Sequence, residues 1–252
     1  MAPPYEAPAL QPPDARMKAQ PPIGLGAIES QPLHEVVYER LRLALMSGQI
    51  APGRKLTSRK LAQELGTSDM PVRSALLRLQ ALRALDQLPN GSMVLPAMTR
   101  ARFADLMTTR LVCEPAATLR AVAGMDRARL VKLRQVAVAL TAAAEDQDID
   151  AYLLHNHDFK FSIYAACGSP SLLFLIETLW LQVGPFLRQF SGQFGNDLRG
   201  ILALDYHDEI VKRLEEGDGE GAAGLLARDI RDGYAFLMEH GRFEQGAGSG
   251  PF

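Results

Sequence analysis

Short polar and basic side chains gather at the start of one predicted helix, and their chemistry suits contact with a nucleic acid. They follow the turn at Gly66 and share one helix face: Ser68, Asp69, Met70, Arg73 and Ser74. The first residues of a recognition helix are those that meet base edges and phosphates in the major groove. The pattern therefore predicts a surface that reads DNA.

Two short helices joined by a tight turn must hold these residues. Apolar residues recur at helical spacing on both sides of the turn, at Leu61, Ala62 and Leu65 and then at Val72, Ala75, Leu76 and Leu79. Gly66 tolerates the positive φ that ends a helix. Ser58 is expected to cap the first helix, and the polar side chains after Gly66 the second. Buried against each other, the two stripes make a helix-turn-helix.

Flanking segments extend this unit to a winged helix-turn-helix. An amphipathic helix is predicted from Leu33 to Ser47, ended by Gly48. After a Pro-Gly turn, Lys55-Leu56 can form a short strand. Two short runs around Asn90-Gly91 predict a β-hairpin, which would be the wing.

Charge is concentrated in this region. The whole chain of 252 residues has a formal net charge of −2, which excludes a protein that is basic throughout. Between residues 33 and 96, nine Arg and Lys face five Asp and Glu, so this segment is net positive and the remainder net negative. A local basic module therefore has to carry any nucleic-acid binding.

With PGRKLTSRKLAQELGTSDMPVRSALLRLQAL at its centre, the segment from Leu33 to about Pro96 resembles the DNA-binding domain of the GntR family of bacterial transcription regulators. The resemblance implies that Arg59 and Arg73 contact DNA and that Asn90 and Gly91 form a wing tip near the minor groove. An arginine offers several donors for phosphate or for guanine O6 and N7. The alternative is that the two arginines form surface ion pairs with Glu64 or Asp69.

Asp69 departs from the family pattern, which usually has a basic residue after the turn serine. A carboxylate there can accept from cytosine N4 or orient Arg73, but it repels phosphate. We therefore expect an altered operator preference and weaker binding.

The second half of the chain is helical in pattern. Apolar stripes separated by short breaks predict six helices in an antiparallel bundle, over 101–122, 126–144, 150–166, 171–190, 197–215 and 219–238. No glycine-rich phosphate loop, nucleophile motif or cysteine-based zinc spacing is present. The predicted fold is mainly α, a winged helix-turn-helix followed by a six-helix bundle. Without such motifs we do not expect an enzyme.

This bundle resembles the FCD effector-binding domain of GntR regulators. The motifs that carry the resemblance are R-L-V-x-E from Arg110, F-x-F-S-I-Y-A-A-C-G-S-P from Phe159 and H-x2-I-x3-L-x3-D-x3-A from His207. Many FCD domains hold a divalent metal with an Asp, a His four residues later and two further His spaced 22 apart. These positions carry Asn156, Lys160, His207 and Asp229 here.

The resemblance therefore implies that the metal site is degenerate. A lysine donates only and excludes a cation, so we expect no metal and instead an ion pair between Lys160 and Asp229, hydrogen-bonded to Asn156 and His207. His155 and His157 are alternative ligands in a shifted register, but at about 100° per residue they point away from the face of residues 156 and 160.

Effectors in the family are commonly small organic acids or acyl compounds, and Arg110 matches a position that often faces the ligand. A pocket holding Arg110 and Lys160 suits a carboxylate. Alternatively, a closed Lys160–Asp229 bridge replaces the metal as an internal clamp without binding any ligand. The residues leave both readings open.

The expected domain organisation is a Pro-rich disordered arm over 1–32, the winged module over 33–97, the effector-binding and dimerisation bundle over 99–241 and a flexible tail over 242–252. Cys113 and Cys167 are read as buried reduced thiols. No apolar run of about 18 residues and no secretory signal is recognised, so a cytoplasmic protein is expected.

Together these features predict a ligand-responsive bacterial regulator, a homodimer on a palindromic DNA operator and a repressor released by a small carboxylate effector. One alternative is an architectural DNA-binding protein whose bundle is purely structural. Another is an all-α enzyme, for which His207, Asp229 and Glu114 would be the only plausible acid-base set.

Overall fold

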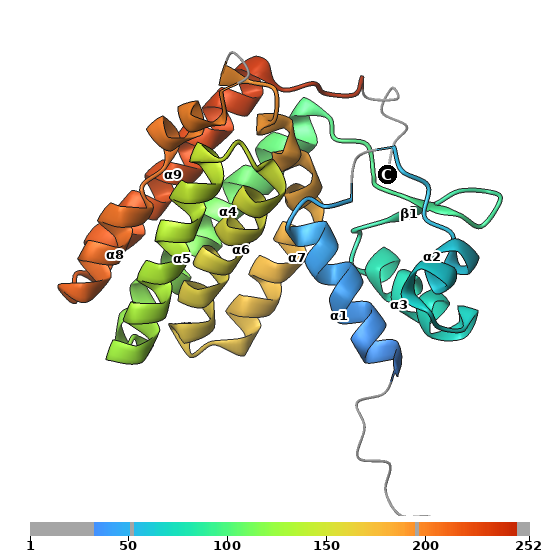
Figure 1. Ribbon diagram of the computed structural model, residues 1–252, viewed down its shortest axis with the longest axis horizontal. Helices are drawn as coiled ribbons and strands as arrows, with labels where there is room; N and C mark the ends of the chain where they lie inside the picture. The colour runs from blue at the N-terminus through green and yellow to red at the C-terminus, as the bar shows by residue number, and fades with distance from the viewer. Residues whose placement is uncertain (1–32, 51–52, 195–196, 246–252) are drawn as a thin grey trace, which may run out of the picture. The chain divides into compact units, whose positions relative to one another are not determined.

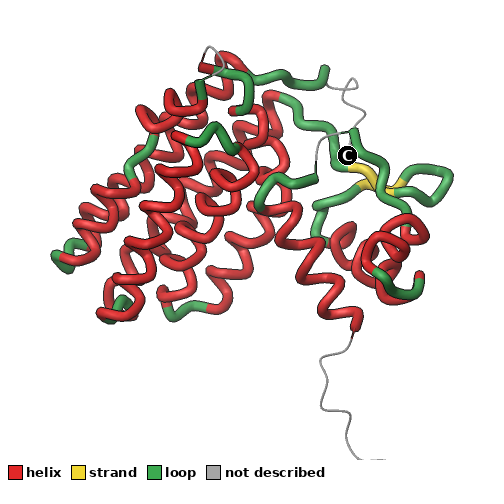
Figure 2. Tube along the Cα trace, in the orientation of Figure 1, coloured by secondary structure: helices red, strands yellow, loops and turns green. Residues whose placement is uncertain are grey.

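The computed structural model describes residues 33–50, 53–194 and 197–245 (Figure 1). The arm predicted over residues 1–32 lies outside the described residues, as do the last seven residues of the predicted tail. In the described part, helices dominate and the only strands are two short ones (Figure 2). This confirms the mainly α fold with a winged helix-turn-helix followed by a helical bundle.

The N-terminal module has three helices and a hairpin. Their bounds are α1 Leu33–Met46, α2 Ser58–Leu65, α3 Asp69–Ala81, β1 Asp86–Gln87 and β2 Met93–Val94. The strands are antiparallel, with Asp86 opposite Val94 and Gln87 opposite Met93. Leu56 forms a single β-bridge to Met93, so the expected strand before α2 is one residue long. Helix α3 packs against both α1 and α2, and Met93 of β2 belongs to the same buried core.

The helix ends of this module differ in detail from the sequence prediction. Gly66 ends α2 with a left-handed φ of 63°, as expected. The cap of α2 is Thr57 rather than Ser58, because the Thr57 hydroxyl accepts from the backbone N–H of Lys60. Ser68 stands at the N-cap of α3, but its side chain makes no capping hydrogen bond. The Ser68 hydroxyl is therefore not used by the helix.

In the described residues, the bundle contains six α-helices, all joined by short turns except α7 and α8. Their bounds are α4 Arg100–Ala121, α5 Arg127–Glu145, α6 Ile149–Tyr164, α7 Pro170–Leu187, α8 His207–Glu215 and α9 Gly219–His240. Short 3-10 turns follow three of them, η1 Val122–Gly124, η2 Ala165–Cys167 and η3 Arg188–Phe190. Helix α4 packs mainly against α9 and α7, and α5 against α6 and α8.

The single helix predicted over 197–215 is wrong. The chain instead forms a 3-10 helix, η5 Leu198–Leu204, then an extended residue, Asp205, before α8 begins. The Asp205 carboxylate accepts from the backbone N–H of His207, so it satisfies a free donor at the start of α8. That break places His207 at the first position of its helix.

Helix α7 is the most apolar helix of the bundle and lies beside α1 (Figure 1). The segment Pro170–Phe190 is long and apolar enough to cross a membrane by length and composition, contrary to our sequence expectation. Its apolarity serves packing on two sides, because it contacts both α4 and α1 and buries Trp180 completely. Core helices of globular domains commonly meet the same criterion.

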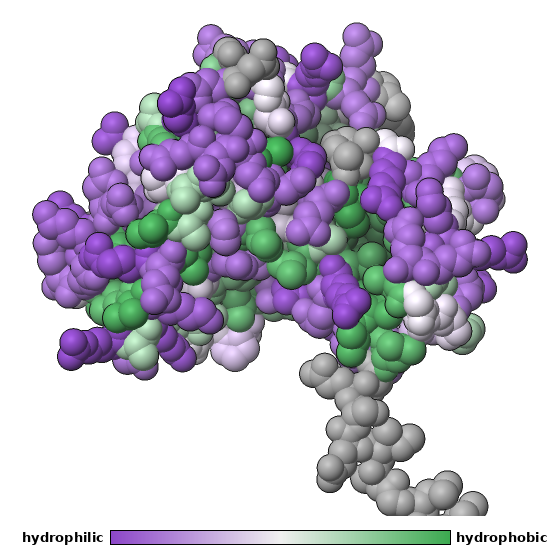
Figure 3. Space-filling model, viewed as in Figure 1, coloured by the Kyte–Doolittle hydropathy of each residue, from purple (hydrophilic) through white to green (hydrophobic). Residues whose placement is uncertain are grey.

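Contact between α7 and α1 depends on a glycine. A Cβ added to Gly184 would lie 2.5 Å from the carbonyl oxygen of Met46 and 2.7 Å from that of Leu45. Only glycine allows the two backbones to approach this closely. The surface over these helices mixes apolar patches with a mostly hydrophilic cover (Figure 3).

The described start of the predicted C-terminal tail is packed rather than free. Gln189 exchanges two hydrogen bonds with the backbone of Arg242, and the N–H of Glu244 donates to the carbonyl of Met98. Phe243 packs against the rings of Phe103 and Phe186. Residues 242–244 therefore belong to the folded domain.

Candidate functional site

The two arginines expected to contact DNA are exposed and unpaired. In the described part of the chain, neither Arg59 nor Arg73 takes part in an ion pair or a side-chain hydrogen bond. Glu64 pairs with Arg54 instead, and Asp69 pairs with no described residue. The alternative in which both arginines are neutralised by Glu64 or Asp69 is therefore wrong.

Helix α3 and the wing enclose a shallow groove of about 290 Å³. It is lined by Ser58, Arg73, Leu76, Leu77, Gln87, Gly91 and Met93. Gly91 has a φ of 80° and Asn90 accepts two hydrogen bonds from Ser92, so both help to shape the tight wing turn. The groove brings Arg73 and the wing tip to one face, as a winged helix-turn-helix requires.

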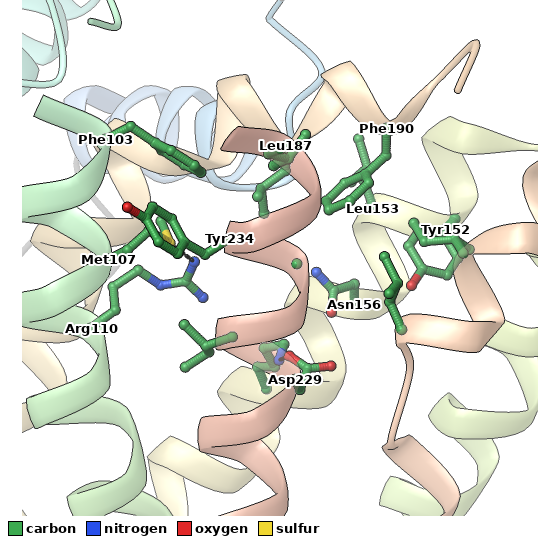
Figure 4. A pocket seen from close by; sticks show the side chains of 16 residues that line it. Phe103, Met107, Arg110, Tyr152, Leu153, Asn156, Leu187, Phe190, Asp229 and Tyr234 are labelled. Carbon is green, nitrogen blue, oxygen red and sulfur yellow. Dashed lines mark hydrogen bonds and ion pairs between the residues drawn. The ribbon is translucent and has the colours of Figure 1, made fainter. Parts of the chain in front are cut away.

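A second candidate site is a small cavity inside the bundle, of about 60 Å³ (Figure 4). Arg110 of α4, Asn156 and Lys160 of α6 and Asp229 of α9 line it. Most other lining residues are apolar or aromatic: Phe103, Met107, Tyr152, Leu153, Leu187, Phe190, Ile201, Leu204, Ile230, Tyr234 and Leu237, with Gly233. Four of the five predicted effector residues are thus brought together, while His207 is not in the lining.

Arg110 is held in place by a buried hydrogen-bond network. Its Nε and Nη2 donate to the two oxygens of Glu114, at 2.5 and 3.2 Å. Glu114 is completely buried and also accepts from the hydroxyl of Tyr164 at 2.5 Å and from the indole N–H of Trp180 at 3.0 Å. Burial raises the pKa of Tyr164, and the neighbouring carboxylate raises it further, so the phenol remains a donor.

One nitrogen of the guanidinium is left without a strong acceptor. Arg110 Nη1 lies 3.6 Å from the sulfur of Met107, a weak acceptor only. The guanidinium carbon also lies 4.8 Å from the centre of the Trp180 ring, a cation–π contact. Figure 4 shows the side chain projecting from α4 into the cavity. Arg110 can therefore bind an acceptor there without losing Glu114.

Lys160 and Asp229 form the expected ion pair. The Lys160 ammonium contacts an oxygen of Asp229, and their side chains are 3 and 13 % exposed. These residues do not fit a divalent metal, because the ammonium stands where a ligand would have to be. Among the described residues, no group of three or more His, Cys, Asp or Glu is placed to hold a metal ion.

His207 lies close by in a separate buried arrangement. Its Nδ1 contacts Asp205, its ring packs edge-on against Phe159, and no described group pairs with its Nε2. Burial, with the Lys160 charge as a second cause, lowers the pKa of His207 well below its usual value. The expected hydrogen bond between Lys160 and His207 is not formed.

The shifted-register histidines do not converge on the cavity. His157 is buried, stacks on Phe161 and contacts the carboxylate of Asp158. His155 is only partly buried and does not line the cavity. A metal site built from these two side chains is not supported.

The sequence did not identify Glu114 as the partner of Arg110. It pointed to Glu114 only as an acid in the enzyme alternative and as part of the FCD-like motif that begins at Arg110. The signal was available, because residues 110 and 114 are one helical turn apart and of opposite charge. Tyr164 and Trp180 come from other helices, and no spacing in the sequence links them to Glu114.

The cavity wall also contacts the DNA-binding module. Leu187 and Phe190 line the cavity, and Arg188 between them donates to the carbonyl of Gly48 at 3.0 Å and to Asp150 at 2.6 Å. One helix turn earlier lies the close contact of Gly184 with α1. A change in the cavity can therefore reach α1 through one short segment.

Comparison with known protein families supports the interpretation of both halves of the chain. Residues 33–94 match the sequence model for bacterial regulatory proteins of the gntR family. Residues 105–232 match that of the FCD domain. The families matched consist of transcriptional regulators rather than enzymes, so the enzyme reading is wrong.

Individual similar proteins support the same family assignment. The HTH-type transcriptional regulator McbR of Escherichia coli (strain K12) is 29 % identical over 217 residues, covering 86 % of this chain and 97 % of McbR. The solved structure of E. coli McbR/YncC superimposes with a TM-score of 0.77 at 28 % identity, over 83 % of this chain and 99 % of that one. A probable D-xylose utilization operon transcriptional repressor of Paenarthrobacter nicotinovorans is 25 % identical, covering 77 and 84 %. This chain therefore belongs to the GntR family of bacterial transcriptional regulators and carries an FCD domain.

Proposed function

We propose that this regulator is a repressor that binds a palindromic operator as a homodimer in the cytoplasm and is released by a small organic acid. The observation that carries the proposal is the bundle cavity, in which Arg110 offers an uncommitted nitrogen among mostly apolar walls. Such a combination selects a ligand with one carboxylate and an apolar body.

The proposed dimer is supported by the small size of the DNA-binding domain. One helix-turn-helix contacts only a short half-site, so specificity is gained when two copies bind related half-sites about one helical turn apart. A two-fold dimer predicts a palindromic sequence. Arg59 and Arg73, which are exposed and pair with no described residue, would supply its phosphate and base contacts.

The charges in the cavity favour a ligand with a single anionic group. Each of its cations already has a carboxylate partner, Glu114 for Arg110 and Asp229 for Lys160. The ligand would therefore use donors that remain available, namely Arg110 Nη1 and the two other protons of the Lys160 ammonium. A second carboxylate on the ligand would find no further cation in this lining.

The small size of the cavity explains how a ligand could change DNA binding. A volume of about 60 Å³ is well below the roughly 300–1,000 Å³ of pockets that hold an organic ligand. A ligand must therefore displace part of the wall, and the segment from Leu187 to Phe190 also carries Arg188, which contacts the end of α1. Binding would favour another arrangement of the DNA-binding module, the differential affinity that regulation requires.

Paired ligands test the proposal. Small carboxylates are screened by thermal unfolding against their uncharged amides, and each hit is added to a complex of the protein with DNA. A ligand at 100 times its Kd adds about 2.7 kcal/mol, which raises Tm by about 5–10 °C at this chain length. We expect acids but not amides to stabilise the protein and release DNA, with both effects lost in Arg110→Gln.

If no carboxylate stabilises the protein or changes its DNA affinity, the architectural reading is supported instead. In that case the Lys160–Asp229 pair is an internal clamp. The same screen also decides the sign of regulation, because an activator would bind DNA more tightly with its ligand.

We further propose that Lys160 replaces the metal of related FCD domains, because its ammonium occupies a ligand position and pairs with Asp229. Calorimetric titration with Zn²⁺ or Ni²⁺ should detect no stoichiometric binding to the wild type. The triple variant Asn156→Asp/Lys160→His/Asp229→His should bind, since it provides four ligands together with His207. Tight wild-type binding that is lost in His207→Ala would refute the proposal.

A further inference from the structure

Met70 is exposed in a way that the fold does not explain. With 73 % of its surface accessible, it is the most exposed large apolar side chain in the part of the chain that the structure describes. The stripe of α3 that packs on the module is formed by Val72, Ala75, Leu76 and Leu79. Met70 therefore contributes little to the core and stands at the start of α3, open to solvent.

Asp69, which precedes it, is also uncommitted. Its side chain is exposed and makes no hydrogen bond or ion pair to any described residue. Arg73 is one helical turn away, the spacing at which opposite charges can pair, yet the two side chains do not contact each other. A carboxylate at this place also lowers the affinity for phosphate.

We propose that Met70 and Asp69 read adjacent base pairs in each half-site, Met70 through a thymine and Asp69 through a cytosine. The inference rests on the proposed DNA binding and specifies its sequence preference. The C5 methyl of thymine is the apolar group on a base edge in the major groove, and an exposed methionine suits it. The exocyclic amine of cytosine donates to a carboxylate.

The two residues act as a unit with Arg73. A carboxylate is unfavourable beside the phosphate backbone, so Asp69 is expected to lie over the base edges. Met70 follows it in the first turn of α3, and its exposed side chain is free to reach a neighbouring base. Arg73, exposed one turn further along α3 and lining the groove next to the wing, faces the backbone or a guanine. The half-site then contains a thymine next to a cytosine.

Selection from a library of random 30-base-pair duplexes tests the inference. Each thymine of the selected sequence is then replaced by deoxyuridine, which removes only the methyl group. At one position per half-site, we expect wild-type affinity to fall about fourfold, the value for one methyl group withdrawn from an apolar contact. Met70→Ala should bind the thymine and uracil duplexes equally.

A control variant and a variant of Asp69 distinguish the contributions of Met70 and Asp69 to the sequence preference. Val138→Ala removes an exposed apolar side chain from α5, outside the DNA-binding module, and should retain the full response to deoxyuridine. Asp69→Asn should select adenine in place of cytosine, because an asparagine pairs with adenine N6 and N7. It should also bind random DNA more tightly, since a negative charge is lost.

Two results overturn the inference while leaving the DNA-binding function intact. In one, wild type binds its selected duplex but no deoxyuridine substitution changes the affinity. In the other, Asp69→Asn selects the same sequence as wild type. If no duplex is enriched even at low salt, the DNA-binding function itself fails.

Discussion

The buried pair of Lys160 and Asp229 makes a sharp prediction about stability. Lys160 is 3 % exposed, so its ammonium regains little water if its partner is neutralised. Removing one member of a buried ion pair costs about 3–5 kcal/mol, because the other charge remains buried and uncompensated. We therefore expect Asp229→Asn to lower the free energy of unfolding by about 3–5 kcal/mol.

At this chain length, a loss of 3–5 kcal/mol lowers Tm by about 6–20 °C. Replacing both residues by apolar side chains of similar size, in Lys160→Met/Asp229→Leu, should restore stability to within about 1 kcal/mol of wild type, since no buried charge is left. Urea unfolding of wild type, Lys160→Met, Asp229→Leu and the double variant forms a double-mutant cycle.

The coupling energy in this cycle shows whether the charges of Lys160 and Asp229 depend on each other. A value of about 2 kcal/mol or more is expected for a pair with this burial. If Asp229→Asn costs less than about 1 kcal/mol and the two substitutions are additive, the charges do not depend on each other. The view that Lys160 is tolerated in the bundle because of Asp229 would then be refuted.

Three further predictions concern the rest of the bundle. Gly184→Ala places a methyl group 2.5 Å from the Met46 carbonyl, so it should push α1 from α7 and abolish ligand control of DNA binding, as measured by binding with and without the effector. Because the pKa of His207 is lowered in the folded state, the unfolded chain takes up the proton first as pH falls below about 6.5. Stability should therefore decline below that pH by up to about 1.4 kcal/mol per unit, and His207→Gln should remove this slope in urea titrations. Burial and the nearby Glu114 raise the pKa of Cys113, so this thiol should react with a thiol reagent at pH 8 only on unfolding, and fast labelling of the native protein would argue against its burial.

Local patterns were sufficient for most of the fold. Residues close in the chain determine where a helix ends, so Gly66 and the Asn90-Gly91 turn identified the helix-turn-helix and the wing before any tertiary contact was known. Periodic apolar stripes likewise gave the helices of the bundle. The exception was 197–215, where Asp205 interrupts a continuous apolar pattern by binding the N–H of His207.

For the candidate site too, some features were predictable from the sequence and others were not. The resemblance to FCD domains placed Arg110 in the effector site and paired Lys160 with Asp229, whereas Glu114 was not recognised as the partner of Arg110 although the two are one helical turn apart. Only the tertiary structure showed that Tyr164 and Trp180, from two other helices, donate to Glu114 and hold it in place.

The size of the cavity and its contact with the DNA-binding module were also visible only in the tertiary packing. The cavity is the space that several helices fail to fill, and its volume depends on rotamers that no spacing encodes. The contact of Arg188 with Gly48 joins residues 140 positions apart. Sequence therefore determined the elements and the charges of this regulator, and long-range packing determined where those charges meet and what they can still bind.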